Sequence, residues 1–348
     1  AMPCDEEFFN LTNGKYGLDA KYLLCNGPFH VSKWTEKTSV KLAKNNEYNG
    51  ESSVSPSSVT FYINNDDSEV ADKMNSVTYD VAFLSSSQFS SIENKKDLNS
   101  VAVQNVTYSF IFNQNDNNYR NKNMRLAFCR SCDTSSLFDS QSDISKADGI
   151  VPPSCKIGGE DYRNGNAAEL LSYDETLAKK NFNDALLELG SSSVETTILC
   201  TEQYEPFVKQ MVQKLQKTLG VKFVSTVKVV SESDLEAAVN DGNYSVAFYP
   251  FKAKSSFAGE IIEVFDQNNI FGYESDVLSQ KIRNIKNNSG SLEGERSAVA
   301  DAENYLVSEA VIMPVFYENS YFVTSKKTSG IYFYSSADNV CFINAKKS

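Results

Sequence analysis

One segment of this chain occurs twice, and the repeat constrains the fold more than any other feature. Residues 59–83, VTFYINNDDSEVADKMNSVTYDVAF, align without a gap with residues 224–248, VSTVKVVSESDLEAAVNDGNYSVAF. Each copy begins with β-branched and aromatic residues typical of a strand, continues as a helix and ends in a second strand. A strand, a helix and a strand in this order predict a parallel pair with a right-handed crossover. We therefore expect an α/β protein.

A capping signal opens the helix of each copy. Asp66 and Glu69 are three residues apart in the first copy, as are Ser233 and Glu236 in the second. This spacing lets the first side chain accept a hydrogen bond from the first backbone N–H groups of a helix. The two helices are expected to start near Ser68 and Ser233.

The repeat also predicts two sheets. A chain of 348 residues exceeds the roughly 250–300 residues at which a single core stops growing. We expect Tyr79–Phe83 and Tyr244–Phe248 to be central strands of two different sheets, one in each of two lobes. Chance similarity is the alternative, because only seven of the 25 aligned positions are identical.

The rest of the chain alternates helix and strand signals. Strands are predicted at 100–114, 194–200, 311–325 and 330–335, and helices at 172–190, 206–220, 275–288 and 293–310. Ser172 and Glu175 form a capping box at the start of the first of these helices, and Gly190 ends it. Residues 148–165 are rich in Pro and Gly and predict a loop.

Composition excludes several partners. The hydrophobic share of 41% is typical of a folded protein, and the net charge of −12 opposes binding to nucleic acid or to an anionic membrane surface. No run of residues approaches the roughly 20 apolar positions of a membrane span. We therefore expect no nucleic-acid partner.

The seven cysteines predict neither a redox centre nor a metal site. Cys129 and Cys132 form one C-x-x-C pair near the end of a predicted helix, whereas a reactive pair is favoured at a helix N-terminus. The only histidine, His30, has no ligand-spaced partner. A buried or disulfide-bonded pair is expected, with no metal and no cofactor.

An enzyme is the rival class of function. The sequence contains no G-x-S-x-G, no H-E-x-x-H and no Gly-rich phosphate loop. A hydrolase with two catalytic carboxylates stays open, because such a pair needs no fixed spacing in the sequence. We expect no catalytic residues.

Five segments, in order along the chain, resemble one family. They are LLCNGPFHVSKW (23–34), NQNDNNYRNKNMRLAF (113–128), GIVPPSCKIG (149–158), AKKNFNDALLELG (178–190) and SEAVIMPVFYEN (308–319). Each is similar to a motif of the extracytoplasmic solute-binding proteins of the oligopeptide, dipeptide and nickel class (solute-binding protein family 5) of ABC transporters.

The resemblance implies a two-lobed, periplasmic-binding-protein-like fold of type II, the Venus flytrap, with a sheet in each lobe and a ligand cleft between the lobes. It implies the substrate-binding component of an ABC importer, which binds an oligopeptide or similar small solute and delivers it to permease subunits. Members are extracytoplasmic, either lipid-anchored lipoproteins at the bacterial cell surface or periplasmic, and the only membrane contact would be an N-terminal lipid anchor. The chain is expected to lack the N-terminal part of the family, which would leave an exposed sheet edge in the first lobe.

The resemblance also divides the chain. Residues 1–108 and 314–348 are expected to build lobe I, and residues 114–308 lobe II. The chain would cross between the lobes near 109–113 and near 309–314, and these crossings would be the hinge.

Ligand contacts are expected where the two repeated strands end, because open α/β sheets bind ligands at the carboxyl ends of their strands. The candidate residues are Ser85, Ser86, Ser87, Tyr108, Asn113, Tyr249, Phe251, Lys252 and Lys254. Peptide-binding relatives hold the peptide ammonium group with an aspartate at the position near Lys252 and Lys254. A lysine repels an ammonium group, so an N-blocked peptide, an anionic solute or a non-peptide solute stays open, as does a position of both lysines in solvent. A surface interaction or sensing module with a degenerate cleft is the alternative function.

Overall fold

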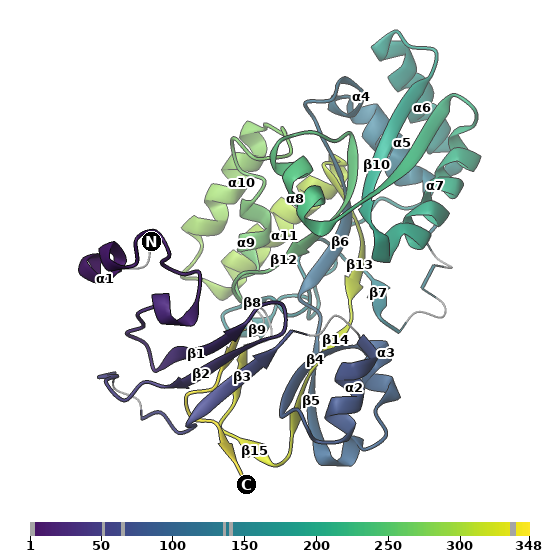
Figure 1. Cartoon of the computed structure of the whole chain (residues 1–348). Helices are drawn as coiled ribbons and strands as arrows, with labels where there is room; N and C mark the ends of the chain where they lie inside the picture. The colour runs from purple at the N-terminus through teal and green to yellow at the C-terminus, as the bar shows by residue number, and fades with distance from the viewer. Residues whose placement is uncertain (1–3, 51–52, 64–66, 135–136, 139–141, 335–338) are drawn as a thin grey trace. The chain divides into compact units, whose positions relative to one another are not determined.

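The computed structural model describes residues 4–50, 53–63, 67–134, 137–138, 142–334 and 339–348. These residues form two compact units (Figure 1). Unit 1 contains the described residues of 4–102, 320–334 and 339–348, and unit 2 contains those of 103–319. The chain therefore passes from one unit to the other after Ala102 and again after Asn319.

Unit 2 is built on a six-stranded mixed sheet with the order β11-β10-β12-β6-β13-β7. The parallel part contains β10, which pairs with both β11 and β12. The antiparallel part contains β6, which pairs with β12 and β13, and β7, which pairs with β13. The strands are β6 (Val106–Phe112), β7 (Ile144–Lys146), β10 (Val194–Thr201), β11 (Phe223–Val230), β12 (Val246–Lys252) and β13 (Ile312–Glu318).

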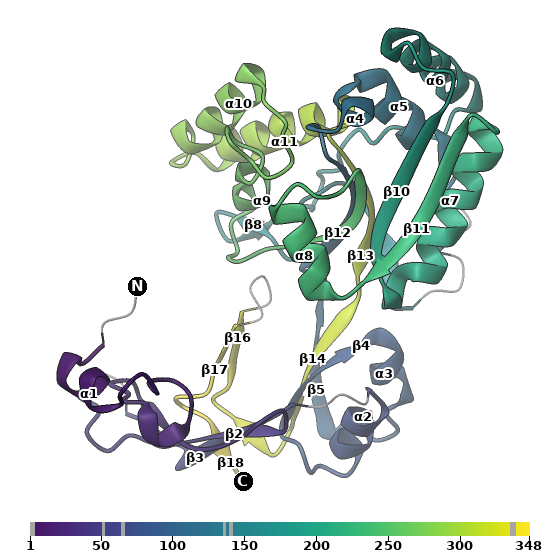
Figure 2. The same cartoon turned by 45° about the horizontal axis from the view of Figure 1, so that its top comes forward.

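Helices cover both faces of this sheet, because its inner strands are apolar on both sides (Figure 2). Along β6, Phe110 and Phe112 pack in one core and Ile111 packs in the other, as the alternation of a strand requires. The first core includes residues of α4 (Asn117–Arg120), α5 (Lys122–Ser131), α6 (Glu175–Leu189) and α7 (Glu205–Leu219). The second core includes residues of α8 (Glu232–Asn240), α9 (Gly259–Glu263), α10 (Asp276–Asn287) and α11 (Leu292–Ser308).

Unit 1 contains two three-stranded sheets, with the orders β1-β2-β3 and β4-β14-β5. The strands are β1 (Phe29–Thr35), β2 (Ser39–Lys44), β3 (Ser58–Tyr62), β4 (Val81–Ser85), β5 (Leu98–Val103, whose last residue belongs to unit 2) and β14 (Ser320–Ser325). Its helices are α1 (Glu6–Leu11), α2 (Asp67–Asn75) and α3 (Ser86–Ser91). A small core joins α2, β4 and β14 through Met74, Leu84 and Val323.

Short elements complete the chain. The 3-10 helices are Ala20–Tyr22, Lys95–Asp97 and Glu202–Tyr204. Three two-stranded ribbons are formed by β8 (Lys156–Ile157) with β9 (Glu160–Asp161), β15 (Thr328–Ser329) with β18 (Lys346–Lys347), and β16 (Tyr332–Tyr334) with β17 (Asn339–Cys341). The first ribbon lies inside the segment that was expected to be a loop.

The α/β class is confirmed, and the two repeated strands do lie in different sheets. The structure corrects the details of the repeat. In the first copy β3 and β4 are not a parallel pair, because each belongs to a different sheet. In the second copy β11 and β12 share a sheet, but β10 lies between them. β12 is an inner strand as expected, whereas β4 is an outer strand of its sheet and β14 is the middle one.

Two capping signals were wrong by two residues. The N-cap of α8 is Ser231, whose Oγ accepts from the Asp234 N–H at 3.1 Å, and not Ser233. The N-cap of α6 is Asp174, which accepts from the Leu177 N–H at 2.9 Å, and not Ser172. In each helix the true N-cap and the expected one are polar residues two positions apart. A rule based only on the spacing between a polar side chain and a later backbone N–H cannot choose between them. Asp66 lies outside the described residues.

The unit boundaries differ from the expected crossings. Residues 109–113 belong to β6 and its end, in the middle of the six-stranded sheet, and Pro314 pairs with Ser109 inside the same sheet. β6 and β13, where the crossings were expected, therefore lie entirely in unit 2. The chain changes unit six residues before the first expected crossing and five residues after the second.

Candidate functional site

The turn at Ser85 to Ser87 joins β4 to α3. Ser85 is the N-cap: its Oγ accepts from the Gln88 N–H at 3.2 Å, and Gln88 Oε1 accepts from the Ser85 N–H at 2.7 Å. The Ser85 and Ser87 hydroxyls are 2.9 Å apart. Ser86 is half-buried and Ser87 is exposed. The cap fixes the backbone of the turn and leaves the Ser87 side chain at the surface of unit 1.

The expected ligand residues at the end of β12 differ in their exposure to solvent. Phe251 is 5% exposed, and its ring packs on Phe265 and Phe271 at centroid distances of 5.6 and 5.9 Å. Lys252 and Lys254 are exposed. The expectation that Phe251 is among the first residues a ligand meets is therefore corrected, because the ring belongs to the core, while the two lysines keep their charge in solvent at little cost.

Tyr249 lies on the same face of β12 as Phe251. The two ring centroids are 5.6 Å apart, and Tyr249 is half-buried. Burial, with a smaller contribution from the Glu236 carboxylate on α8, raises the pKa of Tyr249 above its usual value. Its hydroxyl therefore stays protonated at neutral pH and can donate or accept a hydrogen bond.

Tyr108 lies on the opposite face of the sheet. Its ring contacts Tyr204, Phe248 and Phe316 at centroid distances of 4.3, 5.5 and 5.1 Å. Burial, and then the Glu318 carboxylate, raise the pKa of Tyr108 well above its usual value. Tyr108 and Phe251 are thus separated by the sheet and do not contribute to one surface.

Asn113 is buried and has its polar atoms engaged. Its Nδ2 donates to the carbonyl oxygens of Gly242 and Tyr244 at 2.9 and 2.7 Å, and its Oδ1 accepts from the Asn115 N–H at 3.0 Å. These bonds tie the end of β6 to the turn that precedes β12. The side chain has a structural role in unit 2.

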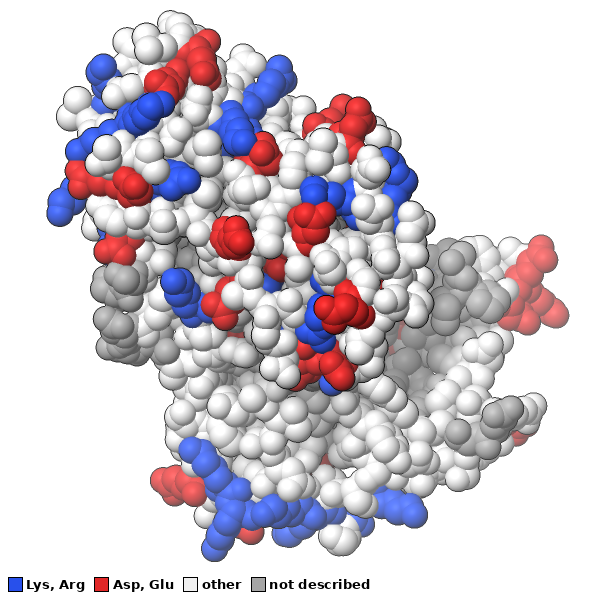
Figure 3. Space-filling model, turned by 180° about the vertical axis from the view of Figure 1, so that it is seen from behind, with Lys and Arg blue, Asp and Glu red and all other residues white. Residues whose placement is uncertain are grey.

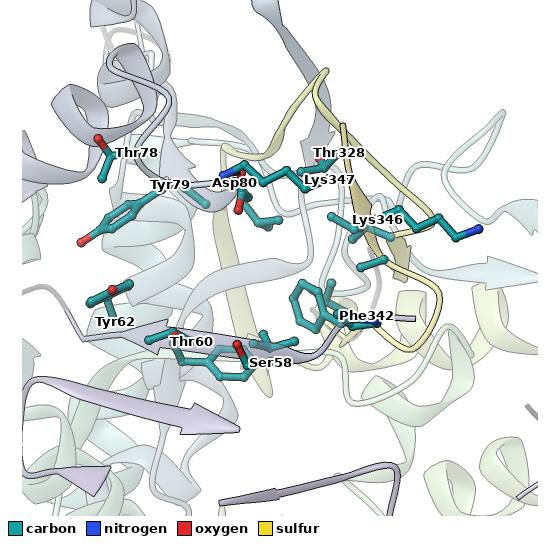
Figure 4. Close-up of a pocket in the computed structure, with 18 of the residues that line it drawn as sticks. Ser58, Thr60, Tyr62, Thr78, Tyr79, Asp80, Thr328, Phe342, Lys346 and Lys347 are labelled. Carbon is teal, nitrogen blue, oxygen red and sulfur yellow. Dashed lines mark ion pairs between the residues drawn. The ribbon is translucent and has the colours of Figure 1, made fainter. Parts of the chain in front are cut away.

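Unit 1 contains a pocket of ≈ 1160 Å³ between β3 and β4 that sequence reasoning missed (Figure 4). All of β3 and residues 79–83 line it, together with the C-terminal segment that includes Phe342, Lys346 and Lys347. Lys347 Nζ lies 2.9 Å from Asp80 Oδ1, and the rings of Tyr62 and Tyr79 stack at a centroid distance of 5.2 Å. The sequence signal was misread because the two strands of the repeat were expected to pair with each other and to leave no space.

A buried ion pair in unit 2 was also missed. Glu303 on α11 is 1% exposed and forms a two-bond pair with Arg163, through Nη1 at 2.9 Å and through Nη2. Its carboxylate also accepts from the Tyr162 hydroxyl and from the Val151 N–H, both at 3.0 Å. Burial alone would lower the pKa of Arg163, but Glu303 outweighs it and raises that pKa. With its acceptors filled, Glu303 is unsuited to act as a catalytic acid or base.

The C-x-x-C pair is confirmed as buried, with both thiols free. Burial raises the pKa of Cys129 to about 12 and that of Cys132 further. Such thiols stay protonated at neutral pH and are poor nucleophiles. The described residues bring no three His, Cys, Asp or Glu side chains together in a group that could hold a metal ion.

Acidic and basic side chains are interspersed over the face of unit 2 that Figure 3 shows. A mixed surface of this kind lacks the single-sign field that draws a protein onto a nucleic acid. Among the described helices, none combines the length and apolar character that a membrane crossing requires.

Comparisons with known proteins agree with this picture. Residues 6–270 match the family model described as "Bacterial extracellular solute-binding proteins, family 5 Middle". The dipeptide-binding protein DppE of Bacillus subtilis (strain 168) is 23% identical over 327 residues, which are 92% of this chain and 60% of DppE. This chain therefore spans less than two thirds of the length of that relative.

Two solved structures share the fold. The substrate-binding domain of an oligopeptide ABC transporter from Bacillus anthracis superposes with a TM-score of 0.78 at 18% identity, over 99% of this chain and 69% of that chain. Listeria monocytogenes OppA bound to peptide superposes with a TM-score of 0.76 at 20% identity, over the same shares of the two chains.

Proposed function

Because this chain belongs to the bacterial extracellular solute-binding proteins of family 5, we propose that it is the substrate-binding component of an ABC importer and binds an oligopeptide or a similar small solute. The family match over residues 6–270 carries the proposal. A dipeptide-binding protein aligns with 92% of this chain at 23% identity, which supports a peptide as the solute. The partners that follow are the permease subunits of the importer.

The proposed place of action is outside the cytoplasm, as the family description implies. The protein would be held at the bacterial cell surface by an N-terminal lipid anchor outside residues 1–348, or would lie in the periplasm. Neither nucleic acid nor direct insertion into a membrane is part of the proposal.

The proposed ligand residues come from both units. Ser85, Ser86 and Ser87 on unit 1 and Tyr249, Lys252 and Lys254 on unit 2 are the candidates that are half-buried or exposed and not enclosed by aromatic rings. Phe251 and Asn113 are buried, and Tyr108 is packed among aromatic rings, so their contribution would be to hold the backbone in place. We place the proposed hinge where the chain passes between the units, at 102–103 and 319–320.

Calorimetry and native mass spectrometry with a library of short peptides, half of them N-acetylated, test the proposal. We expect one peptide per protein and unchanged peptide mass after incubation. Absence of peptide binding would favour the interaction or sensing module, and cleavage of the peptide would favour a hydrolase. Either result would overturn the proposal.

The role of Lys254 has a matched control. Two unit charges about 4 Å apart in water interact by roughly 1 kcal/mol, which corresponds to about fivefold in affinity. Lys254→Glu is therefore expected to favour free-amine over acetylated peptides by about fivefold or more, whereas Lys286→Glu, an exposed change on α10, should leave the ratio unchanged. Equal ratios in the two variants would remove Lys254 from the site.

A further inference from the structure

Six exposed lysines gather on unit 1, and none of them is among the proposed ligand residues. Figure 3 shows basic side chains along the bottom of the view, where unit 1 lies, with few acidic side chains among them. The six are named here the lysine patch. They are three Lys-Lys pairs from segments far apart in the sequence, namely Lys95 and Lys96, Lys326 and Lys327, and Lys346 and Lys347.

Backbone hydrogen bonds bring the three pairs together. The Lys326 N–H donates to the Asp97 oxygen at 2.9 Å, which joins the second pair to the first. The Ser348 N–H donates to the Lys327 oxygen at 2.8 Å, and β15 pairs with β18, so the third pair is joined to the second. The three segments are therefore neighbours in the fold of unit 1, although about 230 positions separate the first from the second.

Most charges of the lysine patch are not neutralised. Among the described residues, only Lys347 of the patch forms an ion pair, with Asp80 Oδ1 at 2.9 Å from its Nζ. Lys95 and Lys326 donate from Nζ to backbone oxygens, which carry no net charge. The other three ammonium groups are exposed and have no partner in the part of the chain that the structure describes.

The fourth Lys-Lys pair of the chain has a different environment. Lys179 and Lys180 on α6 each form an ion pair with a carboxylate four residues away on the same helix. Unit 2, which contains α6, has 30 acidic and 20 basic residues, whereas unit 1 has 15 acidic and 13 basic residues. The net charge of −12 therefore comes mainly from unit 2 and does not describe the lysine patch.

Salt makes the local charge decisive. The Debye length is about 8 Å at physiological ionic strength, so a charged surface in contact with the patch is affected mainly by the nearest charges. The three segments, 93–97, 326–329 and 345–348, contain two carboxylates, Glu93 and Asp97, against six lysines. The patch is therefore locally positive, and the net charge of the whole chain does not exclude an anionic membrane surface as its partner.

The lack of arginine in unit 1 indicates the kind of partner. All six arginines of the chain lie in unit 2. Protein interfaces are enriched in arginine and depleted in lysine. A guanidinium group makes fixed two-bond contacts, whereas an ammonium group is a strongly hydrated point charge. A surface made only of lysines therefore suits hydrated anionic groups that have no fixed positions, such as the phosphate headgroups of a lipid bilayer.

We propose that the lysine patch binds the surface of a membrane that contains anionic phospholipids. Each lysine near such a surface strengthens binding by about fivefold. The contact is electrostatic and inserts no segment into the bilayer. It would hold unit 1 at the membrane, where the permease subunits are, while the negative charge of unit 2 is repelled. This inference rests on the proposed place of action, but vesicle binding and peptide binding are separate measurements, and either can fail without the other.

Sedimentation of residues 1–348 with lipid vesicles tests the proposal. We expect binding to vesicles made of equal parts of phosphatidylglycerol and phosphatidylcholine, and little binding to vesicles of phosphatidylcholine alone. Binding should be lost when the salt concentration rises from about 0.1 M to about 1 M, because the Debye length falls from about 10 Å to about 3 Å. Equal binding to the two kinds of vesicle would overturn the proposal.

Two triple variants locate the contact. The first removes the three patch charges that have no partner, by Lys96→Gln, Lys327→Gln and Lys346→Gln. The control removes three exposed, ion-paired lysines from unit 2, by Lys179→Gln, Lys180→Gln and Lys209→Gln. We expect the first variant to bind anionic vesicles about 100-fold more weakly, and the control to change binding by less than about twofold. Because all six side chains are exposed, both variants should keep the melting temperature of the unsubstituted protein.

Two results with these variants would contradict the proposal. Equal weakening in both variants would show that the vesicles respond to net charge and not to the lysine patch. A soluble polyphosphate that binds through the three patch lysines, under conditions in which anionic vesicles do not bind, would assign the patch to a free anionic polymer instead of a membrane.

Discussion

Glu303 shows how one buried residue can organise a whole loop. Its carboxylate binds Arg163, the Tyr162 hydroxyl and the Val151 N–H, and so connects α11 to the Pro- and Gly-rich segment. Glu303→Gln leaves the Arg163 charge buried without its partner, which costs about 3–5 kcal/mol. Asp301→Asn on the same helix is the matched control, since Asp301 is 58% exposed and its pair with Lys281 contributes about 0–1 kcal/mol. Urea unfolding of both variants checks the difference, and similar midpoints would contradict it.

The cysteines provide a second prediction at the residue scale. Burial raises the pKa of Cys129 and Cys155 to about 12 and that of Cys200 to about 11, so these thiols remain protonated and shielded at pH 8. Cys4 is exposed. We expect iodoacetamide to label Cys4 in the native protein, and to label the four buried cysteines, Cys129, Cys132, Cys155 and Cys200, only in denaturant, as peptide mapping would show. Native labelling of Cys129 at the rate of Cys4 would reopen a redox role.

The raised pKa values of these thiols make the free energy of unfolding depend on pH. Below about pH 8.5 the thiols are protonated in both the folded and the unfolded chain, and their contribution to stability is complete. Above that pH the unfolded chain loses protons that the folded chain keeps, so the free energy of unfolding falls as pH rises toward 11–12. We expect the urea midpoint to decrease from pH 8 to pH 11, and Cys200→Ala to decrease less steeply than the unsubstituted protein. A urea midpoint that does not change between pH 8 and pH 11 would contradict the raised pKa values of the buried thiols.

At the scale of single elements, only one of two nearby polar residues caps the start of α6. Asp174 accepts from the Leu177 N–H, whereas Ser172, which the sequence favoured, lies outside the cap. Asp174→Ala should destabilise the protein by about 1 kcal/mol, and Ser172→Ala should have little effect. Thermal unfolding of the two variants checks the assignment, and the reverse order would restore the original capping box.

Sequence patterns predicted the types of elements well and their pairing less well. The helices α7, α10 and α11 lie within a few residues of their expected ranges, because their apolar faces and end signals are local. β4 pairs with β14, which follows the whole of unit 2 in the sequence, and no local pattern encodes that partner. β3 pairs with β2, the strand directly before it, and the repeat pattern pointed to β4 instead. The same limit applies to the ligand residues. Tyr108 and Phe251 lie on different strands, so their separation by face depends on the pairing of β6 with β12. Burial of Phe251 depends on Phe265 and Phe271, which come from outside β12.

At the scale of the whole molecule, the two units differ in the size of their cores. Unit 2 buries apolar side chains on both faces of a six-stranded sheet, whereas the core of unit 1 is the small cluster around Met74, Leu84 and Val323. Because stability grows with buried apolar area, we expect unit 1 to open first. Hydrogen exchange in residues 1–348 should be faster in α2 and β4 than in α5 and α7, and equal protection would show that the units unfold together.

The order of the strands in unit 1 also has a consequence for the synthesis of the protein. β14, the middle strand of β4-β14-β5, is encoded after the whole of unit 2. At about 5–20 residues per second, the ribosome needs on the order of 10–40 s to pass from β5 to β14. During this interval β4 and β5 have no strand to join them, so the first part of the chain stays open while the rest is translated. The amino-terminal part of unit 1 can therefore complete this sheet only after unit 2 has been made.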